Sequence, residues 1–393
     1  MPSTDRAEQS VPLARRTQGL SRSPIRRMFD LAQSMDGEDL VHFEIGEPDF
    51  DTPAHIIDAA TDALHEGATH YTSNAGLPPL RTAIAADLQA DFDPTDEIVV
   101  TAGAMEALAL TMLTVVDPGD EVLVPTPAWP NYTNQCEMVG ATLRGVEMDA
   151  ASGFDLDPAA IIEAMGPDTA AVIITNPSNP TGRVFDPAAV EAVVEAAAAR
   201  DIYVIADEVY RDLTYDAPYR EIAAETAHDA HVITVGSCSK TYAMTGWRVW
   251  WLAAAPAVIE RAIMFHEGLV ACAPAVSQHA ALAALTGDRA PVEEMLAAFG
   301  RRREYVIDRI ASLPMVTSPR PEGAFYAYLD FSDLQMDAET VATRLLEEHG
   351  VVTAPGTGFG RVAGEHVRIS FATNREQIGR GFDRIEAFIE EHT

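Results

Sequence analysis

Short apolar runs alternate with helical stretches through the middle of this chain, and this alternation limits the folds that are open to it. Five such runs follow one another from about residue 98: EIVVT, EVLVP, AVIIT, IYVIAD and HVITVGS. Stretches with helical spacing lie between them, among them AMEALALTMLTVV and DPAAVEAVVEAAAAR. Apolar runs of this length, each followed by a helix, are typical of buried parallel strands with helical crossovers. We therefore predict an α/β fold whose mostly parallel sheet is covered by helices.

The pattern changes in the last third of the chain. A long helix over residues 291–312 precedes the strand-like GAFYAYLD, and a further helix leads to GVVTAPG, HVRISFA and a closing helix. This mixture is typical of a smaller α+β domain. We predict three parts: an N-terminal arm and helix over residues 1–45 that packs with the small domain, a large domain over 46–285, and a small domain over 286–393.

The chain is strongly acidic. Asp and Glu number 60 against 27 Lys and Arg, so the formal net charge is −33 and the sequence pI is about 4.5. Such a field repels nucleic acids and anionic membranes, and neither is expected as a partner. A salt-rich cytoplasm, as in a halophilic cell, would screen the self-repulsion, because the Debye length falls to ~3 Å at about 1 M salt. No apolar leader and no run of ~18 apolar residues is found, so we expect a cytoplasmic protein.

Amine and thiol side chains are scarce. Lys240 is the one lysine among the 27 basic residues. An amine can lose its proton and attack a carbonyl carbon, whereas a guanidinium stays protonated, so a site that needs a Schiff base cannot accept arginine. The alternative is that Lys240 merely survived a compositional drift against lysine. Cys136, Cys238 and Cys272 have the spacing of neither a disulfide framework nor a metal site, and no metal is expected.

Chemically versatile residues follow each of the five apolar runs, at the ends where ligands of parallel α/β sheets bind. In chain order they are Gly103, Trp129, Asn179 in NPSNPTG, Asp207 and Tyr210 in DEVY, and Ser237 with Lys240 in SCSK. Each has a structural alternative, such as a tight turn, an aromatic plug at the core's edge or a helix cap. Together they offer an anion-binding turn, an aromatic plate, an amide, a carboxylate and an amine. This set suits a planar, phosphorylated aldehyde with a protonated ring nitrogen, which is pyridoxal phosphate.

Two arginines extend the set. Arg248 lies eight residues beyond Lys240, in TGWR, and Arg368 lies within the strand-like HVRISFA. An arginine in an apolar strand needs an anionic partner, which is either a ligand carboxylate or an internal acid. Ser237 and Lys240 also match S-x-x-K, the nucleophile motif of β-lactamase-like enzymes. That motif requires a K-T-G element as well, and the chain has no second lysine.

The motifs NPSNPTG, DEVY and SKTYAMTGWR, in this order and spacing, resemble the class I and II aminotransferases, which are fold type I pyridoxal-phosphate enzymes. The similarity covers nearly the whole chain and is closest to the archaeal aspartate and aromatic amino-acid aminotransferases. It implies a large domain with a mostly parallel sheet and a smaller α+β domain. It also implies ping-pong transfer of an amino group from an L-amino acid, with aspartate or aromatic donors preferred, to a 2-oxo acid such as 2-oxoglutarate.

The resemblance further implies roles at the cofactor. Lys240 would form the internal aldimine and later move the substrate proton, and Asp207 would pair with the pyridine nitrogen. Tyr210 and Asn179 would hydrogen-bond the ring hydroxyl, and Trp129 would stack on the ring. The residues implied to cradle the phosphate are Gly103, Ala104, the backbone of Met105, Ser237 and Arg248.

On the substrate side, the resemblance implies that Arg368 binds the α-carboxylate and that Gly46, in IGEPDF, closes over it beside Trp129 and Asn179. Tyr71, in HYTSNAG, would reach the phosphate in a neighbouring subunit, which implies a homodimer with shared sites. Amino acids and 2-oxo acids are the expected small-molecule partners.

Two positions depart from the family's pattern. Met105 stands where relatives selective for aspartate often carry a lysine, which leaves the side-chain carboxylate without that partner. Trp250, in WRVWW, stands where relatives usually have glycine.

A β-lyase or decarboxylase of the same fold is an alternative function, because the cofactor site is common to all enzymes of this fold. A non-enzymatic pyridoxal-phosphate-binding regulator would need a helix-turn-helix domain ahead of the fold, for which the arm is too short.

The charge balance predicts that folding depends on salt. Dialysis from molar salt into millimolar buffer should unfold the chain, because about −33 formal charges then repel one another without screening. Circular dichroism across a salt series measures the helical signal. Full secondary structure in millimolar buffer would contradict this hypothesis.

Overall fold

A seven-stranded sheet forms the centre of the molecule. The computed structural model describes residues 13–14, 17, 19–20, 22–35, 39–216, 219–361 and 364–393. The strands of the sheet are β2 (Ile98–Thr101), β3 (Glu121–Thr126), β4 (Thr142–Glu147), β5 (Thr169–Thr175), β6 (Tyr203–Asp207), β7 (Val232–Ser237) and β8 (Trp250–Ala253). Their order is β2-β8-β7-β6-β5-β3-β4. All neighbours from β4 to β7 run parallel, whereas β8 is antiparallel to both β2 and β7. The predicted α/β fold with a mostly parallel sheet is confirmed.

Two of these strands do not belong to the five apolar runs. Strand β4 lies at the edge of the sheet and none of its residues is buried, so its sequence TLRGVE shows no apolar run. Strand β8 is fully buried and inserts between β2 and β7, directly after the segment that carries Lys240. The segment that carries Lys240 therefore leaves the sheet at the end of β7 and rejoins it at β8, the neighbouring strand.

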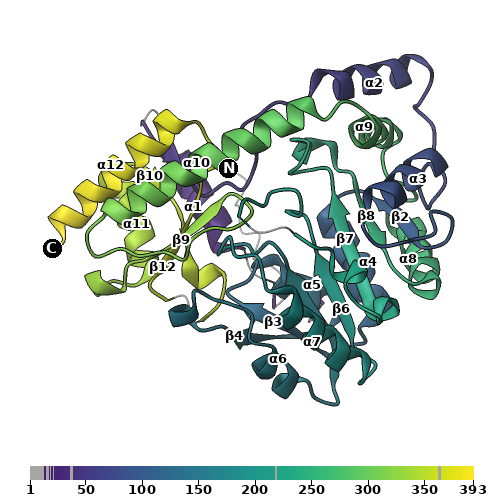
Figure 1. Cartoon of the computed structure of the whole chain (residues 1–393), viewed down its shortest axis with the longest axis horizontal. Helices are drawn as coiled ribbons and strands as arrows, with labels where there is room; N and C mark the ends of the chain where they lie inside the picture. The colour runs from purple at the N-terminus through teal and green to yellow at the C-terminus, as the bar shows by residue number, and fades with distance from the viewer. Residues whose placement is uncertain are drawn as a thin grey trace, which may run out of the picture.

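Helices cover both faces of the sheet (Figure 1). They are α2 (Ala54–His65), α3 (Pro78–Asp87), α4 (Ala104–Val115), α5 (Asn131–Val139), α6 (Pro158–Ala164), α7 (Pro187–Ala198), α8 (Pro256–Leu269) and α9 (Ala275–Thr286). Successive strand residues point to opposite faces, so Ile205 of β6 packs in one core with α4, α5 and α8. Its neighbour Val204 packs in a second core with α2, α3, α6, α7 and α9. Burial on both faces explains why these strands are continuously apolar.

The C-terminal part forms a separate layer of strands and helices. Strands β9 (Tyr326–Asp330), β11 (Ala354–Pro355) and β12 (His366–Ser370) form an antiparallel sheet in the order β11-β12-β9. It is accompanied by α10 (Ala290–Ser312), α11 (Ala338–His349) and α12 (Arg375–Glu391). The long α10, predicted over 291–312, runs from the helices of the large sheet to this layer (Figure 1).

The N-terminal segment lies beside this C-terminal layer. Strand β1 (Val41–His42) pairs in parallel with β10 (Val351–Val352), and α1 (Pro24–Ser34) contacts β10 and β11. The boundaries at 45/46 and 285/286 remain predictions.

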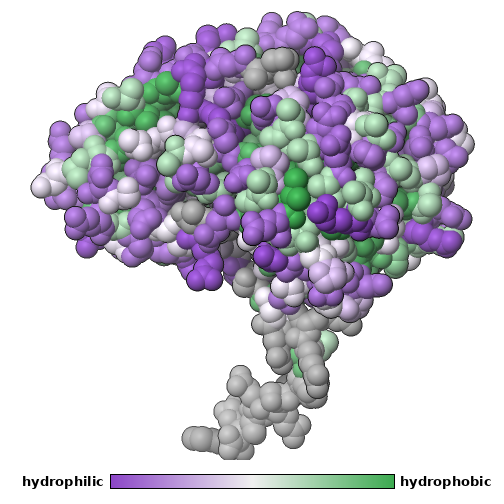
Figure 2. Space-filling model, turned by 60° about the horizontal axis from the view of Figure 1, so that its bottom comes forward, coloured by the Kyte–Doolittle hydropathy of each residue, from purple (hydrophilic) through white to green (hydrophobic). Residues whose placement is uncertain are grey.

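The surface is predominantly polar. Figure 2 shows hydrophilic residues over most of the face that it draws, with apolar groups between them. None of the helices in the described part of the chain combines the length and the apolar character needed to cross a membrane. Within the same residues, no group of three His, Cys, Asp or Glu side chains is arranged to hold a metal ion.

Arg303 ties α10 to the segments that lead into the C-terminal sheet. Its side chain is only 2% exposed. Its Nε donates a hydrogen bond to the carbonyl of Pro321 at 2.5 Å, and its other nitrogens pair with Asp216 and Glu304. A buried guanidinium is tolerated because these acceptors replace the water that it loses.

We expect Arg303→Ala to lower the free energy of unfolding by about 1–3 kcal/mol, because it removes a buried side chain and leaves the carbonyl of Pro321, a buried residue, without its donor. Urea denaturation in high salt measures the change. Arg301→Ala is the matched control, since Arg301 is an exposed arginine of the same helix and such surface changes stay within about 0.5 kcal/mol. Equal stability of the two variants would contradict the structural role of Arg303.

Candidate active site

A cleft of about 930 Å³ opens at the carboxyl ends of the parallel strands. This is the edge where ligands of such sheets bind. It brings together most of the residues predicted from the sequence: Gly46, Ala104, Met105, Trp129, Asn179, Asp207, Tyr210, Lys240, Arg248 and Arg368. Gly103 directly precedes the lining residue Ala104 at the start of α4, and Ser237, at the end of β7, lies two residues before the lining residue Ser239. Tyr71 does not line the cleft and is 88% exposed.

Lys240 lies in the turn between β7 and β8, and its side chain remains partly open to the cleft. Its Nζ donates a hydrogen bond to the carbonyl of Gly46 at 2.6 Å. Burial lowers the pKa of Lys240 to about 8, while the Glu47 carboxylate opposes this shift. Burial acts in this direction because it disfavours the charged form of an amine. A substantial share of the amine is therefore neutral near pH 8, as a nucleophile or proton acceptor requires.

Asp207 ends β6 and is buried. Its Oδ2 accepts a hydrogen bond from the Tyr132 hydroxyl at 2.6 Å, and the same hydroxyl lies 2.7 Å from Thr175 Oγ1. Its Oδ1 has no hydrogen-bond partner among the described residues. Burial raises the pKa of Asp207 to about 6, although the bond from Tyr132 opposes this. A buried carboxylate oxygen without a partner is costly, and a cationic N–H donor from a ligand would satisfy it.

The start of α4 and the Arg248 side chain form a cradle. Gly103 precedes the helix with φ +103°, and a Cβ placed there would lie 2.1 Å from an Arg248 guanidinium nitrogen. Only glycine permits this approach at that backbone conformation. The first N–H groups of the helix have no partner within the helix, so the cradle combines backbone donors with a guanidinium and suits a phosphate. Ser237 at the end of β7 accepts a hydrogen bond from the Ser239 N–H at 2.8 Å.

Arg368 lies on β12 and is 2% exposed. It donates to Asn179 Oδ1 at 3.2 Å and to the Glu44 carbonyl, and its guanidinium stacks 4.4 Å from the centre of the Tyr326 ring. Its Nε has no partner, and it pairs with no carboxylate in the part of the chain that the structure describes. The alternative of an internal ion pair is therefore not found there. A buried guanidinium without an anion is costly, and a ligand carboxylate would complete it.

Two close approaches shape the wall beside Arg368. The hydroxyls of Tyr210 and Tyr326 lie 2.8 Å apart, and a Cβ on Gly46 would lie 2.1 Å from the Tyr326 hydroxyl. Trp129 makes an edge-to-face contact with Tyr132, with their ring centres 5.5 Å apart. These contacts hold the aromatic residues in fixed orientations around the cleft.

Sequence reasoning missed several residues that line the cleft: Arg22, Arg26, Tyr132, Ser239 and Tyr326. Tyr132 stands three residues after Trp129, in WPNY, so its place beside a predicted site residue was a usable signal. Ser239 directly precedes Lys240 in SCSK and carries the same kind of signal. Arg22, Arg26 and Tyr326 carry none; Tyr326 is brought to the cleft by the pairing of β9 with β12.

Comparison with known proteins agrees with this geometry. The model of the family "Aminotransferase class I and II" matches residues 38–385. An aspartate aminotransferase of Musicola paradisiaca is 35% identical over 97% of both chains. An aromatic-amino-acid aminotransferase of Thermococcus litoralis is 34% identical over 97% of this chain and 99% of its own.

Solved structures are similar as well. The aspartate aminotransferase of Thermus thermophilus with maleate superposes with a TM-score of 0.91 at 34% identity, over 96% of this chain and 99% of its own. The relatives and the solved structure match this chain over nearly its full length. Their sequence identities of 34–35% are high enough to show membership of a family and not only a shared fold. The chain therefore belongs to the class I and II aminotransferases, which are transferases that use pyridoxal 5′-phosphate and act on amino-acid and oxo-acid substrates.

Proposed function

We propose that this chain moves an amino group between an L-amino acid, with aspartate or an aromatic amino acid as preferred donor, and a 2-oxo acid such as 2-oxoglutarate. In this proposal Lys240 holds the cofactor and the reaction is ping-pong. One observation carries the proposal: three groups line one cleft. They are the Lys240 amine, an Asp207 oxygen and the buried Arg368, and among the described residues that oxygen has no hydrogen-bond partner and Arg368 has no carboxylate partner.

The residues of the cleft fit pyridoxal phosphate. Asp207 Oδ1, which has no hydrogen-bond partner in the described part of the chain, would accept the ring N–H. Tyr210 and Asn179 would bind the ring hydroxyl, and Trp129 would cover the ring face. The residues that would hold the phosphate are Gly103, Ala104, the backbone of Met105, Ser237 and Arg248. When bound, the cofactor supplies an electron-accepting ring that stabilises negative charge at the substrate Cα atom.

Lys240 is proposed as the proton carrier. With its pKa lowered to about 8, its neutral form can take the proton from the substrate Cα atom, and its protonated form can return a proton. Asp207 would hold the ring proton by supplying a buried negative charge. Its own pKa of about 6 lies below neutral pH, so the carboxylate is mostly ionised there even before that cation is bound.

Arg368 is proposed to bind the substrate α-carboxylate. The guanidinium is held in place by Asn179, the Glu44 carbonyl and the Tyr326 ring, so a bound carboxylate takes a fixed orientation. The absence of a side chain on Gly46 leaves room for the Tyr326 hydroxyl next to this site.

The choice of donor depends on the mouth of the cleft. Met105 offers no charge, but Arg22 and Arg26 also line the cleft, where both pair with Asp30. These cations would suit the side-chain carboxylate of aspartate. Phe29 and Trp129 line the same cleft and would suit an aromatic side chain. Both donor classes are therefore kept in the proposal.

We further propose a homodimer in a salt-rich cytoplasm. The exposed side chain of Tyr71 would reach the phosphate site of the second subunit. Helices α2 and α8 expose apolar side chains that a second subunit would cover: Ile57, Leu64, Met264, Phe265 and Leu269. The net charge of −33 supports the salt-rich setting.

A panel of donors tests the reaction type. With aspartate, phenylalanine and alanine as donors and 2-oxoglutarate as acceptor in high salt, we expect glutamate to form without release of ammonia. Double-reciprocal plots against either substrate should be parallel, because a ping-pong enzyme releases its first product before it binds the second substrate. Release of ammonia or carbon dioxide in place of glutamate would instead identify a lyase or decarboxylase.

Arg368→Gln tests the carboxylate site. We expect KM for the amino acid and for the oxo acid to rise roughly 10- to 100-fold, since a hydrogen bond to a charged group contributes about 1.5–3 kcal/mol. Steady-state kinetics measure the change. Arg375→Gln is the matched control, because Arg375 is exposed and stacks on Tyr305 outside the cleft. An unchanged KM in the Arg368 variant would contradict its role.

A further inference from the structure

The turn that carries Lys240 is fixed by the side chains on either side of it. The turn belongs to no regular helix or strand, and its Ala243 has φ +51°. On one side, Ser239 Oγ accepts a hydrogen bond from Trp250 Nε1 at 2.7 Å. On the other side, Thr241 Oγ1 donates to Asp212 Oδ2 at 2.9 Å. Both the serine and the threonine are buried, whereas the side chain of Asp212 is partly exposed.

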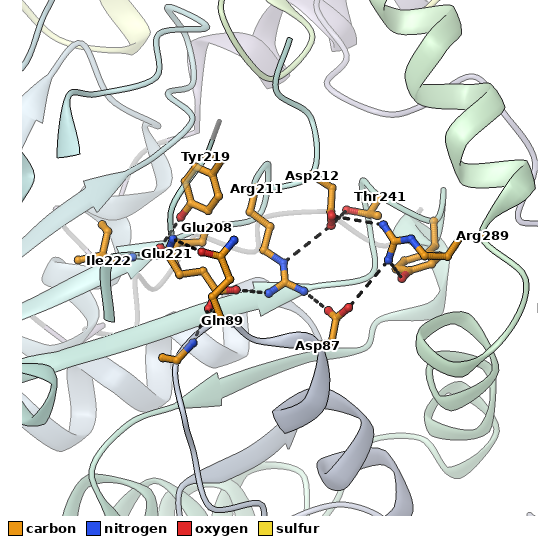
Figure 3. Close-up of polar contacts among 12 residues, drawn as sticks. Asp87, Gln89, Glu208, Arg211, Asp212, Tyr219, Glu221, Ile222, Thr241 and Arg289 are labelled. Carbon is orange, nitrogen blue, oxygen red and sulfur yellow. Dashed lines mark hydrogen bonds and ion pairs between the residues drawn. The ribbon is translucent and has the colours of Figure 1, made fainter. Parts of the chain in front are cut away.

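Asp212 is itself held by two arginines (Figure 3). Arg289, at the start of α10, lies 3.4 Å from Asp212 Oδ1 and also donates to the Tyr242 hydroxyl at 3.0 Å. Arg211 lies 3.8 Å from Asp212 Oδ2 and pairs with Asp87 at the end of α3. The carboxylate that receives Thr241 is thus attached to two helices that flank the turn. It cannot rotate away without breaking ion pairs.

The same network extends to Glu221, beside a second set of contacts around Glu208. Arg211 donates to Glu221 at 2.5 Å, and Glu221 accepts the Gln89 N–H at 2.6 Å. Glu208, directly after Asp207, accepts the Ile222 N–H at 2.8 Å and a bond from the Tyr219 hydroxyl. Figure 3 shows the network that runs from Gln89 and Glu221 through Arg211, Asp87, Asp212 and Arg289 to Thr241, with the Glu208 contacts beside it. The two sets adjoin where Glu221 and Ile222 follow one another in the chain, and the first of them supports the turn of Lys240.

We propose that Asp212 is a positioning residue for the reaction: by holding the Thr241 hydroxyl, it sets the place of the Lys240 amine. The proposal rests on the proposed function, in which Lys240 both holds the cofactor and moves the proton. A positional error of ~1 Å at such a group costs on the order of 100-fold in rate. Asp212 and Thr241 do not line the cleft, so they would act on the reaction indirectly, through the turn that carries Lys240.

The test uses Thr241→Val, which removes the hydroxyl and keeps the shape, and Asp212→Ala. We expect both to lower kcat roughly 10- to 100-fold with KM within about twofold. Thr241→Ser keeps the hydroxyl and should restore kcat. Asp216→Ala is the matched control, since Asp216 is also paired with two arginines but bonds to no residue of the Lys240 turn. It should lower stability and leave kcat unchanged.

The single lysine provides a second measurement that does not depend on activity. Incorporation of lysine labelled with ¹³C at the ε carbon alone gives one labelled lysine NMR signal, from Lys240. After removal of the cofactor, we expect one narrow signal in the parent, in Thr241→Ser and in Asp216→Ala. Thr241→Val and Asp212→Ala should give a shifted or broadened signal, because the amine then takes several positions.

The two measurements separate the proposals. If Thr241→Val keeps both kcat and the lysine signal of the parent, Asp212 has no positioning role. If the parent enzyme transfers no amino group, the proposed function fails, while the lysine signal still decides whether Asp212 fixes the position of Lys240. A loss of kcat in Asp216→Ala equal to that in Asp212→Ala would show a general effect of stability and would also overturn the inference.

Discussion

The removal of charged groups from water is the constraint on which the site depends. Burial lowers the pKa of Lys240 to about 8 and raises the pKa of Asp207 to about 6. Arg368 pairs with no carboxylate among the described residues. Each group is costly where it stands. A protonated ring nitrogen would compensate Asp207, and a ligand carboxylate would compensate Arg368. In the proposed function, cofactor and substrate together would supply both groups.

The parallel sheet brings these charged side chains together in one cleft. Its strands are buried on both faces, so their carboxyl ends are rigid and project side chains from distant parts of the chain into one cleft. The Lys240 turn has no such support from regular structure, and polar contacts replace it. Trp250 stands where relatives usually have glycine, and the sequence offered no reason for this residue. In the structure its Nε1 donates a hydrogen bond to Ser239, so Trp250 helps to hold the Lys240 turn.

Much of the site follows from the sequence because apolar runs mark the strands and the versatile residues come directly after them. Lys240, Asp207, Trp129 and Asn179 were placed in this way. Tyr326 and Asp212 were not, because their contacts form between segments far apart in the chain: Tyr210 meets Tyr326 across 116 residues, and Thr241 meets Asp212 across 29. Strand β4 was not predicted, because an edge strand with no buried residues does not require an apolar run. The role proposed for Tyr71 depends on a second subunit, and within its own chain the side chain is exposed.

The most direct test of the account is the site of cofactor attachment. The purified protein is reduced with borohydride, which makes an imine linkage permanent, and is then digested and examined by mass spectrometry. The account predicts that the peptide spanning residue 240 gains the mass of the reduced cofactor. A colourless protein whose residue-240 peptide has its unmodified mass after reduction would contradict it.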